Sequence, residues 1–442
     1  MDTKVSDALV PSQSRSGLEG ETLRAVTWRL IPFLFVLYVV SFLDRVNVGF
    51  AALDMNRDLK FGPAVYGFGA GIFFIGYALF EIPSNLILAR IGARLWIARI
   101  MITWGVIAAG MMFVNGPFSF YVLRFLLGVA EAGFFPGMIF YLSQWYPAEA
   151  RARAVAMFMT AIPVSGMIGG PISGALLNLG GWLGLAGWQW LFVLEGLPAV
   201  LLGFAVLRFL PDRPDSAEWL APDQRRWLLK RLAAERDWCG EHHGFSVVRA
   251  LCNGVVWQLG FLLFLSASFG TYALGLWLPQ IVRNFSNLNN LQIGFVSAIP
   301  SLVGLVAMVI VAAHSDRTGE RCLHIAAVSA ASAIGFIGCA LAQSPVVAVI
   351  FLSVAAAGLL SVYGPFWPLP SKFLTGTAAA GGIALINTLS NLSGFAGPYT
   401  IGLLNSASGD FRAGLLLLAI VPLAGMVLAL RLRHAALFKD VV

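Results

Sequence analysis

Long runs of apolar residues recur along the whole chain and alternate with short polar segments. Twelve runs can be marked, at residues 28–51, 64–89, 96–114, 118–145, 152–179, 188–210, 251–282, 293–313, 324–342, 346–373, 379–404 and 413–432. Each run is long enough to cross a ~30 Å hydrocarbon core, which takes about 20 helical residues. The pattern therefore predicts an all-α membrane protein with twelve transmembrane helices.

A charged segment at residues 211–250 separates six runs from the other six. We interpret it as a cytosolic linker with one short amphipathic helix around 219–236. The predicted organisation is a disordered cytosolic tail at 1–27, a six-helix bundle at 28–210, the linker at 211–250, a second six-helix bundle at 251–433 and a cytosolic tail at 434–442. No cleavable signal peptide is evident in the polar first 25 residues.

Composition and charge agree with a membrane protein. Of the 442 residues 58% are hydrophobic and 12% charged, and the mean hydropathy is +0.80. The net charge of +7 is scattered over loops, so membrane topology explains it better than nucleic-acid binding. Of the 29 Lys and Arg residues, the loops on one side of the membrane hold only Arg57, Lys60, Arg283 and Arg412. Because basic residues stay in the cytoplasm, both termini are expected there, in the inner membrane.

Cysteine and histidine residues give no sign of a metal or cofactor site. Cys239, Cys252, Cys322 and Cys339 form no CxxC pair, and no histidine lies at ligand spacing beside them. We expect unpaired thiols, no metal and no cofactor.

The two halves share a loop motif. Arg90, Gly92 and Arg94 follow the second run, and Arg317, Gly319 and Arg321 follow the eighth, after Asp316. The same R-x-G-x-R pattern at equivalent places predicts two pseudo-symmetric halves, as in secondary transporters, with the substrate site between them near the membrane midplane. We interpret these two segments as gating loops.

Charges within the predicted spans are the main candidates for function. Arg45 and Arg124 are the only basic residues there, with Asp44 beside the first and Glu131 about two turns beyond the second. Charges in a membrane are costly and usually functional, although an ion pair that locks two helices is the structural alternative. We expect all four side chains to meet around one cavity.

These residue types suit the cotransport of an organic anion and a proton. A guanidinium stays charged and binds a carboxylate in a bidentate manner. A buried carboxylate beside an arginine gains a proton more readily once an anion occupies that arginine. The four residues therefore indicate that binding of an organic anion at an arginine is coupled to proton uptake by a neighbouring carboxylate.

Other polar side chains complete the candidate site. Asn387 and Asn391 lie four residues apart on one face of a predicted span, and Tyr77 and Trp367 are expected in the cavity wall. Interhelical hydrogen bonds would also satisfy the two amides. For Glu81 and Glu195 we favour a structural role, bracing loop arginines or helix termini, over proton binding.

Four stretches resemble the anion:cation symporter family of the major facilitator superfamily. They are Ser41–Asn47 (SFLDRVN), Glu81–Leu86 (EIPSNL) with the loop that follows it, Arg124–Gly133 (RFLLGVAEAG) and Ser315–Arg321 (SDRTGER). Gly187–Gly196 (GWQWLFVLEG) looks most like the tartrate and phthalate permeases of that family. The chain departs from the superfamily at Ala89, where an aspartate usually stands.

The resemblance implies that Arg45 binds the substrate carboxylate, that Asp44 and Glu131 bind protons, and that Arg124 pairs with Glu131 or gates beside it. It also implies that Tyr77 and Asn391 line the pocket. We therefore expect a proton symporter for a small organic acid, not an enzyme, that works by alternating access as a monomer in lipid. Anion exchange without protons and a transporter-like membrane sensor are the alternatives.

Overall fold

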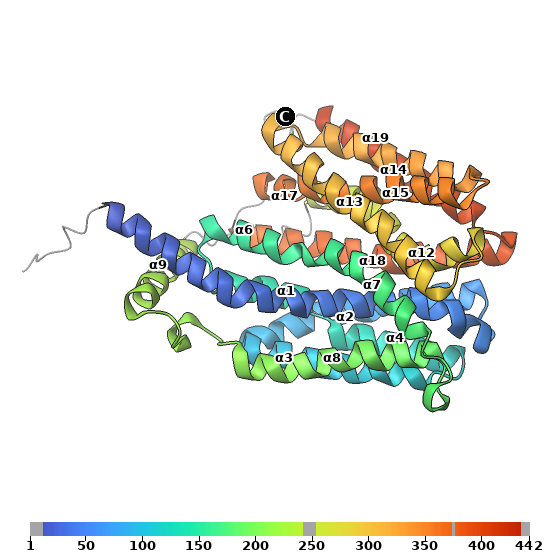
Figure 1. Cartoon of the computed structure of the whole chain (residues 1–442). Coiled ribbons are helices and arrows are strands. Elements are labelled where there is room, and N and C mark those ends of the chain that lie inside the picture. The colour runs from blue at the N-terminus through green and yellow to red at the C-terminus, as the bar shows by residue number, and fades with distance from the viewer. Residues whose placement is uncertain (1–11, 242–252, 374–375, 435–442) are drawn as a thin grey trace, which may run out of the picture.

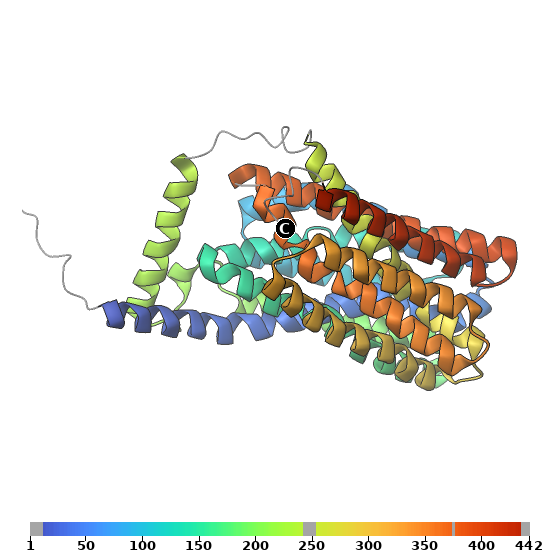
Figure 2. The same ribbon diagram turned by 90° about the horizontal axis from the view of Figure 1, so that it is seen from above.

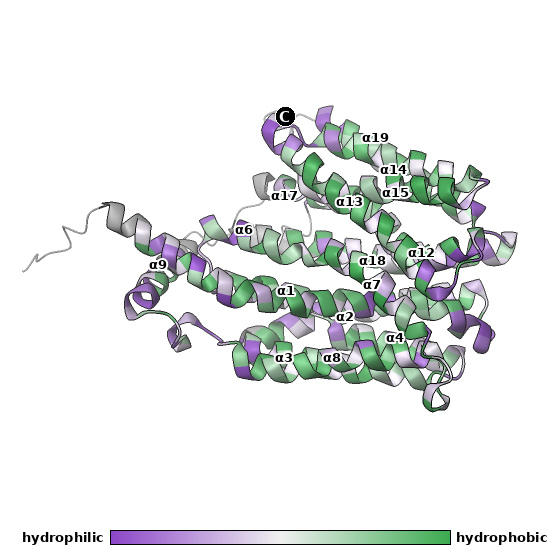
Figure 3. Cartoon of the chain, viewed as in Figure 1, coloured by the Kyte–Doolittle hydropathy of each residue, from purple (hydrophilic) through white to green (hydrophobic). Residues whose placement is uncertain are grey.

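The computed structural model describes residues 12–241, 253–373 and 376–434, and every regular element in these ranges is a helix. The helices form two bundles side by side (Figures 1 and 2). Eleven of the described helical segments are long and apolar enough to cross a membrane. Apolar residues cover the helices, whereas hydrophilic residues gather at their ends and on the linker helix (Figure 3).

The first bundle contains six of the predicted spans. Its helices are α1 (Ser12–Asp58), α2 (Pro63–Ile91), α3 (Ala93–Gly110), α4 (Pro117–Glu131), α5 (Phe134–Ser143), α6 (Ala148–Met159), α7 (Ala161–Leu177) and α8 (Gly187–Phe209). Short helical turns η1 (Met111–Phe113), η2 (Trp182–Gly184) and η3 (Pro214–Ser216) lie between or after them. Two predicted spans are each split into two helices, α4 with α5 and α6 with α7. The first split is at Gly133, whose φ of 85° favours glycine.

The linker and the second bundle follow in the expected order. The predicted amphipathic helix is present as α9 (Pro222–Glu241). The second bundle has α11 (Gly254–Leu263), the π-helical turn η4 (Phe264–Ser268), α12 (Phe269–Phe285), α13 (Asn290–Thr318), α14 (Cys322–Leu341), α15 (Pro345–Ser361), α16 (Tyr363–Phe366), α17 (Pro368–Phe373), α18 (Gly376–Ser408) and α19 (Arg412–His434). The eleventh predicted span, at residues 379–404, lies within α18, a helix of 33 residues that is not among the eleven candidate membrane spans.

The prediction of a disordered tail up to residue 27 is wrong from Ser12 onward, because α1 already begins there. Thr22 and Val26 are fully buried in this first part of the helix. Val26 continues the apolar stripe of Leu30 and Leu34 at a spacing of four residues, so the buried face of the helix extends before the membrane span.

The lipid-facing surface is apolar. On α13 the side chains of Val306, Val309 and Ile310 are more than half exposed, and only 17% of the most apolar window of that helix is buried. Large apolar side chains exposed along a whole helix fit a bilayer rather than water.

The two bundles meet most closely at one end of the molecule. The start of α1, helix α9 and the end of α19 lie toward the other end, which we call the terminal end (Figure 1). At the opposite end, glycines replace side chains between the bundles. A Cβ added at Gly170 of α7 would lie 2.3 Å from the carbonyl oxygen of Gly294 of α13, and one at Gly67 of α2 would lie 2.6 Å from that of Pro398 of α18. The opposite end is therefore closed by backbone-to-backbone packing.

Candidate functional site

An ion pair between Arg45 of α1 and Glu131 of α4 lies at the centre of the candidate site. A guanidinium nitrogen of Arg45 donates to Oε1 of Glu131 in a short contact, and Ser41 Oγ donates to the same oxygen at 2.9 Å. The arginine side chain is 7% exposed and the glutamate is fully buried. In such surroundings each charge depends on the other, because an unpaired ion is costly to bury.

Both partners of this pair keep an unused polar atom. Among the described residues, neither Nε of Arg45 nor Oε2 of Glu131 has a hydrogen-bond partner. The rings of Phe73 and Tyr77 lie 5.6 and 5.3 Å from the guanidinium carbon of Arg45. The guanidinium thus has aromatic cover and free donor capacity for a further acceptor.

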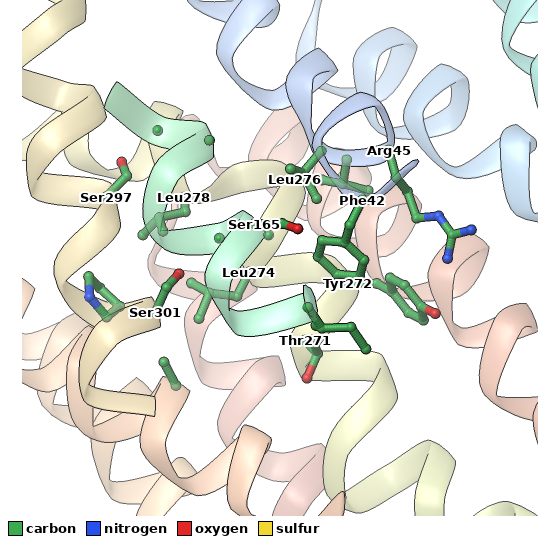
Figure 4. Close-up of a pocket in the computed structure, with 18 of the residues that line it drawn as sticks. Phe42, Arg45, Ser165, Thr271, Tyr272, Leu274, Leu276, Leu278, Ser297 and Ser301 are labelled. Atoms are coloured by element: carbon green, nitrogen blue, oxygen red, sulfur yellow. The ribbon is translucent and has the colours of Figure 1, made fainter. Parts of the chain in front are cut away.

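Arg45 also lines a cavity of ≈ 110 Å³ between the two bundles (Figure 4). The first bundle contributes residues of α1, α2 and α7, and the second contributes residues of α12, α13 and α15. Arg45 is the one charged residue among the described residues that line the cavity, where most others are apolar or small. Tyr272 of α12 points to the same side as Arg45 and lies beside it (Figure 4).

A second polar contact joins the two bundles next to this cavity. Asn387 Nδ2 of α18 donates to Oε1 of Glu81 on α2 at 2.8 Å, and Asn391 Nδ2 approaches Oε2 at 3.5 Å. Oδ1 of Asn391 accepts from the hydroxyl of Tyr272 at 3.3 Å. The interpretation that Glu81 braces a loop arginine or a helix terminus is therefore wrong, since its partners are the two amides of the opposite bundle.

Arg124 does not pair with Glu131, although the two share α4. Its guanidinium donates to the backbone carbonyls of Gly69 and Ala70 on α2, at 3.4 and 3.1 Å, and lies 4.9 Å from the ring of Phe73. The predicted pairing is wrong because the side chain of Arg124 turns to the adjacent helix. Glu131 pairs instead with Arg45 of α1.

Asp44 also lies apart from the ion pair. Its two oxygens accept from Trp104 Nε1 of α3 at 2.7 Å and from Asn47 Nδ2 at 3.0 Å. Adjacent residues on a helix point in directions about 100° apart, so Asp44 faces the interior of the first bundle while Arg45 faces the cavity. The expectation that all four charged side chains line one cavity is therefore wrong. Arg45 alone lines the cavity, and Glu131 contacts it through the ion pair with Arg45.

Glu195 of α8 is a further buried carboxyl group of the first bundle. Its Oε1 accepts from Ser173 Oγ of α7 at 2.8 Å, and its Oε2 has no partner among the described residues. These contacts lie within the bundle and involve no loop arginine, so that interpretation is wrong for Glu195 as well.

Trp367 is not one of the described residues that line the cavity. It packs edge-on against Phe366 with ring centroids 5.5 Å apart, within a separate apolar cluster of the second bundle. Its role as a substrate contact stays a prediction.

The two predicted gating loops have different internal contacts. In the second half Asp316 pairs with Arg321 at 2.7 Å, and Gly319 ends α13 with a φ of 73°. In the first half, Asp212 accepts from the backbone nitrogen of Arg94 at 2.9 Å, next to Gly92 with its φ of 100°. The carboxylate that contacts this loop is therefore Asp212, from the start of the linker. The remaining loop arginine of the second half, Arg317, is exposed.

Several residues that build the site were not identified from the sequence. Ser41 bonds Glu131, Phe73 lies between both arginines, and Trp104 bonds Asp44. Only Ser41 could have been suggested by the sequence, because it lies one helical turn before Arg45 and therefore on the same face of the helix. Within the described residues no group of three metal-ligand side chains gathers. Cys322 and Cys339 are free thiols, whereas Cys252 and the side chain of Cys239 lie outside the described residues.

Comparisons with known proteins show the family and the fold of the chain. The family model of the Major Facilitator Superfamily matches residues 34–398. The chain is 49% identical to a protein of Agrobacterium vitis with a provisional assignment as a tartrate transporter, over 95% of this chain and 93% of that protein. It is 45% identical to the quinolone resistance transporter of Acinetobacter baumannii, over 93% and 94%. It is 38% identical to the inner membrane transport protein RhmT of Escherichia coli K12, over 92% and 94%.

A solved structure shows the same fold. The chain is similar to the crystal structure of a bacterial homologue of the human lysosomal transporter Spinster, in an inward-facing and occupied conformation. The TM-score is 0.76 with 16% sequence identity, over 93% of this chain and 97% of that chain. At this identity the likeness concerns the fold alone.

Proposed function

The chain belongs to the Major Facilitator Superfamily and is a secondary transporter, and we propose that it imports a small organic acid anion such as tartrate together with protons. The observation that carries this proposal is the position of Arg45, a buried guanidinium in the wall of the cavity between the bundles. A carboxylate is the group that such a planar donor binds best. Apolar and aromatic walls fit the carbon chain of a small acid.

The ion pair with Glu131 links the anion to a proton. A substrate carboxylate that binds Arg45 competes with Glu131 for the same guanidinium. A fully buried carboxylate that loses its cation is strongly destabilised, and it relieves this by taking a proton. The anion and the proton therefore enter together. Asp44, which accepts only from neutral donors, is the second proton-binding group of the proposal.

Proton entry supplies the driving force. An inside-negative potential opposes an anion by about 2.3 kcal/mol per charge and 100 mV, so the uptake of an organic anion needs cotransported cations. Protons meet this need without a metal or cofactor. The substrate, protons and lipid are the partners in this proposal, and the chain acts as a monomer.

The glycine contacts at the opposite end fit alternating access. In this conformation the bundles touch there through Gly170 and Gly67, and transport requires these contacts to separate in the other state. Because basic loop residues gather toward the terminal end, that end faces the cytoplasm in our proposal. The membrane is the inner one, as for the relative RhmT.

Uptake into proteoliposomes tests the proposal. Tartrate, galactonate, phthalate and 4-hydroxyphenylacetate are offered in turn with an imposed inward proton gradient. We expect one of these acids to accumulate only while the gradient lasts, and Arg45→Ala to abolish its uptake. Accumulation that does not depend on the proton gradient but is driven by a gradient of a second anion would show anion exchange instead.

A further inference from the structure

The site has two groups of donors that hold a carboxylate, one in each bundle. In the first bundle, Arg45 offers its guanidinium and is held by Glu131. In the second bundle, Asn387 and Asn391 present two amide donors and are held by Glu81. Each group therefore binds a carboxylate that belongs to the chain itself, and both of those carboxylates come from the first bundle.

The two groups of donors are connected. Tyr272 lies beside Arg45, and its hydroxyl donates to Oδ1 of Asn391 at 3.3 Å, so one side chain neighbours both the guanidinium and the amide pair. Tyr77 stands one helical turn before Glu81 on α2 and lies 5.3 Å from the guanidinium of Arg45. A small molecule that touches Arg45 is thus within reach of the amides.

Glu81 belongs to the interface between the bundles and not to the interior of one. It is 6% exposed, no basic side chain pairs with it among the described residues, and both of its oxygens contact the opposite bundle. A second carboxylate cannot join the same two amides while Glu81 is ionised, since two like charges in one site repel each other strongly. Glu81 must lose its charge for another carboxylate to bind there.

We infer that the transporter selects dicarboxylates, with one carboxylate at Arg45 and the other at Asn387 and Asn391, and that Glu81 takes up a proton when the second carboxylate replaces it. This inference rests on the proposed function and adds the substrate class and a further proton site. Glu81 takes the proton from water on the side where the substrate enters and returns it on the other side. The substrate then joins the two bundles in place of Glu81.

A matched pair of substrates tests the inference. L-threonate has the carbon chain and hydroxyl groups of L-tartrate, with a hydroxymethyl group in place of one carboxylate. In proteoliposomes we expect wild-type protein to transport tartrate with an affinity about tenfold higher than threonate, the ratio typical of a lost charged hydrogen bond. Asn387→Ala is expected to remove most of this preference.

Proton counting tests the role of Glu81. The ratio of protons to substrate is measured from the membrane potential that just balances an imposed substrate gradient. Glu81→Gln is expected to lower the ratio by about one for tartrate and to leave it unchanged for threonate. The control is Glu195→Gln, the same change at a buried carboxyl group whose hydrogen bond stays within the first bundle; it is expected to keep both ratios.

The outcomes separate this inference from the proposed function. If wild-type protein accumulates none of the four acids named above with the proton gradient, the proposed function fails. If it accumulates galactonate or 4-hydroxyphenylacetate but neither tartrate nor phthalate, the proposed function stands and the inference is overturned. If wild-type protein transports tartrate and threonate equally well, or Glu81→Gln leaves the tartrate ratio unchanged, the proposed function stands and the inference is overturned. An equal drop with Glu195→Gln would overturn it too, because the effect would not belong to the interface.

Discussion

Glu131 is paired with Arg45 of α1 and not with Arg124, which is on the same helix as Glu131. This relationship ties the candidate proton site to the candidate substrate site through one guanidinium. It also gives the pair a structural role, because each buried charge is balanced only by the other.

The first prediction concerns that balance. Arg45→Met leaves the buried carboxylate of Glu131 without its cationic partner. It is expected to lower the free energy of unfolding by about 3–5 kcal/mol, the usual cost of breaking a buried ion pair. Adding Glu131→Gln to Arg45→Met is expected to recover most of this loss without restoring transport. Melting temperatures of the purified proteins in detergent measure the effect. A double variant no more stable than Arg45→Met would contradict the pairing.

The second prediction concerns Arg124. Its hydrogen bonds go to backbone carbonyls of α2, so it holds two helices together. Arg124→Lys loses the planar fork and is expected to reduce the stability by about 1.5–3 kcal/mol, as for a hydrogen bond to a charged group. The ratio of protons to substrate is expected to stay at the wild-type value. A changed ratio would show that Arg124 acts directly on a proton site.

The third prediction concerns the closed opposite end. A side chain at Gly170 collides with the backbone of Gly294, so Gly170→Val is expected to prevent closure and to lower the uptake rate by about tenfold or more. Gly110→Val is the control, because a Cβ at Gly110 meets nothing within 4 Å. A single cysteine at Asn290, the first residue of α13, reports closure by its labelling rate, because the carbonyl oxygen of Asn290 would lie 2.5 Å from a Cβ added at Gly174 of α7. We expect faster labelling in Gly170→Val than in the control, and equal rates would argue against a closed end at these glycines.

The fourth prediction concerns topology. Reporter fusions after Glu241 in the linker and after His434 are expected to show both sites in the cytoplasm, whereas a fusion after Asn115 is expected to lie outside. Alkaline phosphatase, which is active only outside, and a fluorescent protein that folds only inside give opposite signals. The reverse pattern would invert the proposed direction of access, although it would leave the fold as described.

The sequence was sufficient for most of the fold. Unbroken apolar runs predict membrane helices because no water is available to satisfy an exposed backbone, and the helices are found where the runs lie. The breaks within runs were missed. Gly133 interrupts a run that is apolar on both sides, and hydropathy does not register a change in φ. The early start of α1 was missed because residues 12–27 are polar overall, and among residues 17–27, whose burial is described, only Thr22 and Val26 are buried.

The sequence located the charged residues of the site but not their partners. The free-energy cost of placing a charged side chain in a membrane helix is enough to identify four functional candidates: Arg45, Arg124, Asp44 and Glu131. Their partners depend on how helices rotate against each other, and a rotation of one residue moves Asp44 from the cavity to the bundle interior. The contact between Glu81 and Asn387 joins residues 306 positions apart in two different bundles, so no local pattern reveals it.

The measurement that tests the central claim most directly compares net accumulation with exchange in Glu131→Gln. The amide of this variant would still accept a hydrogen bond from Arg45 but cannot take a proton. Proteoliposomes loaded with unlabelled tartrate report exchange of labelled tartrate, and empty proteoliposomes with an inward proton gradient report accumulation. We expect exchange to continue while accumulation driven by protons is lost. Accumulation at the wild-type level in this variant would contradict the claim that Glu131 couples the anion to the proton.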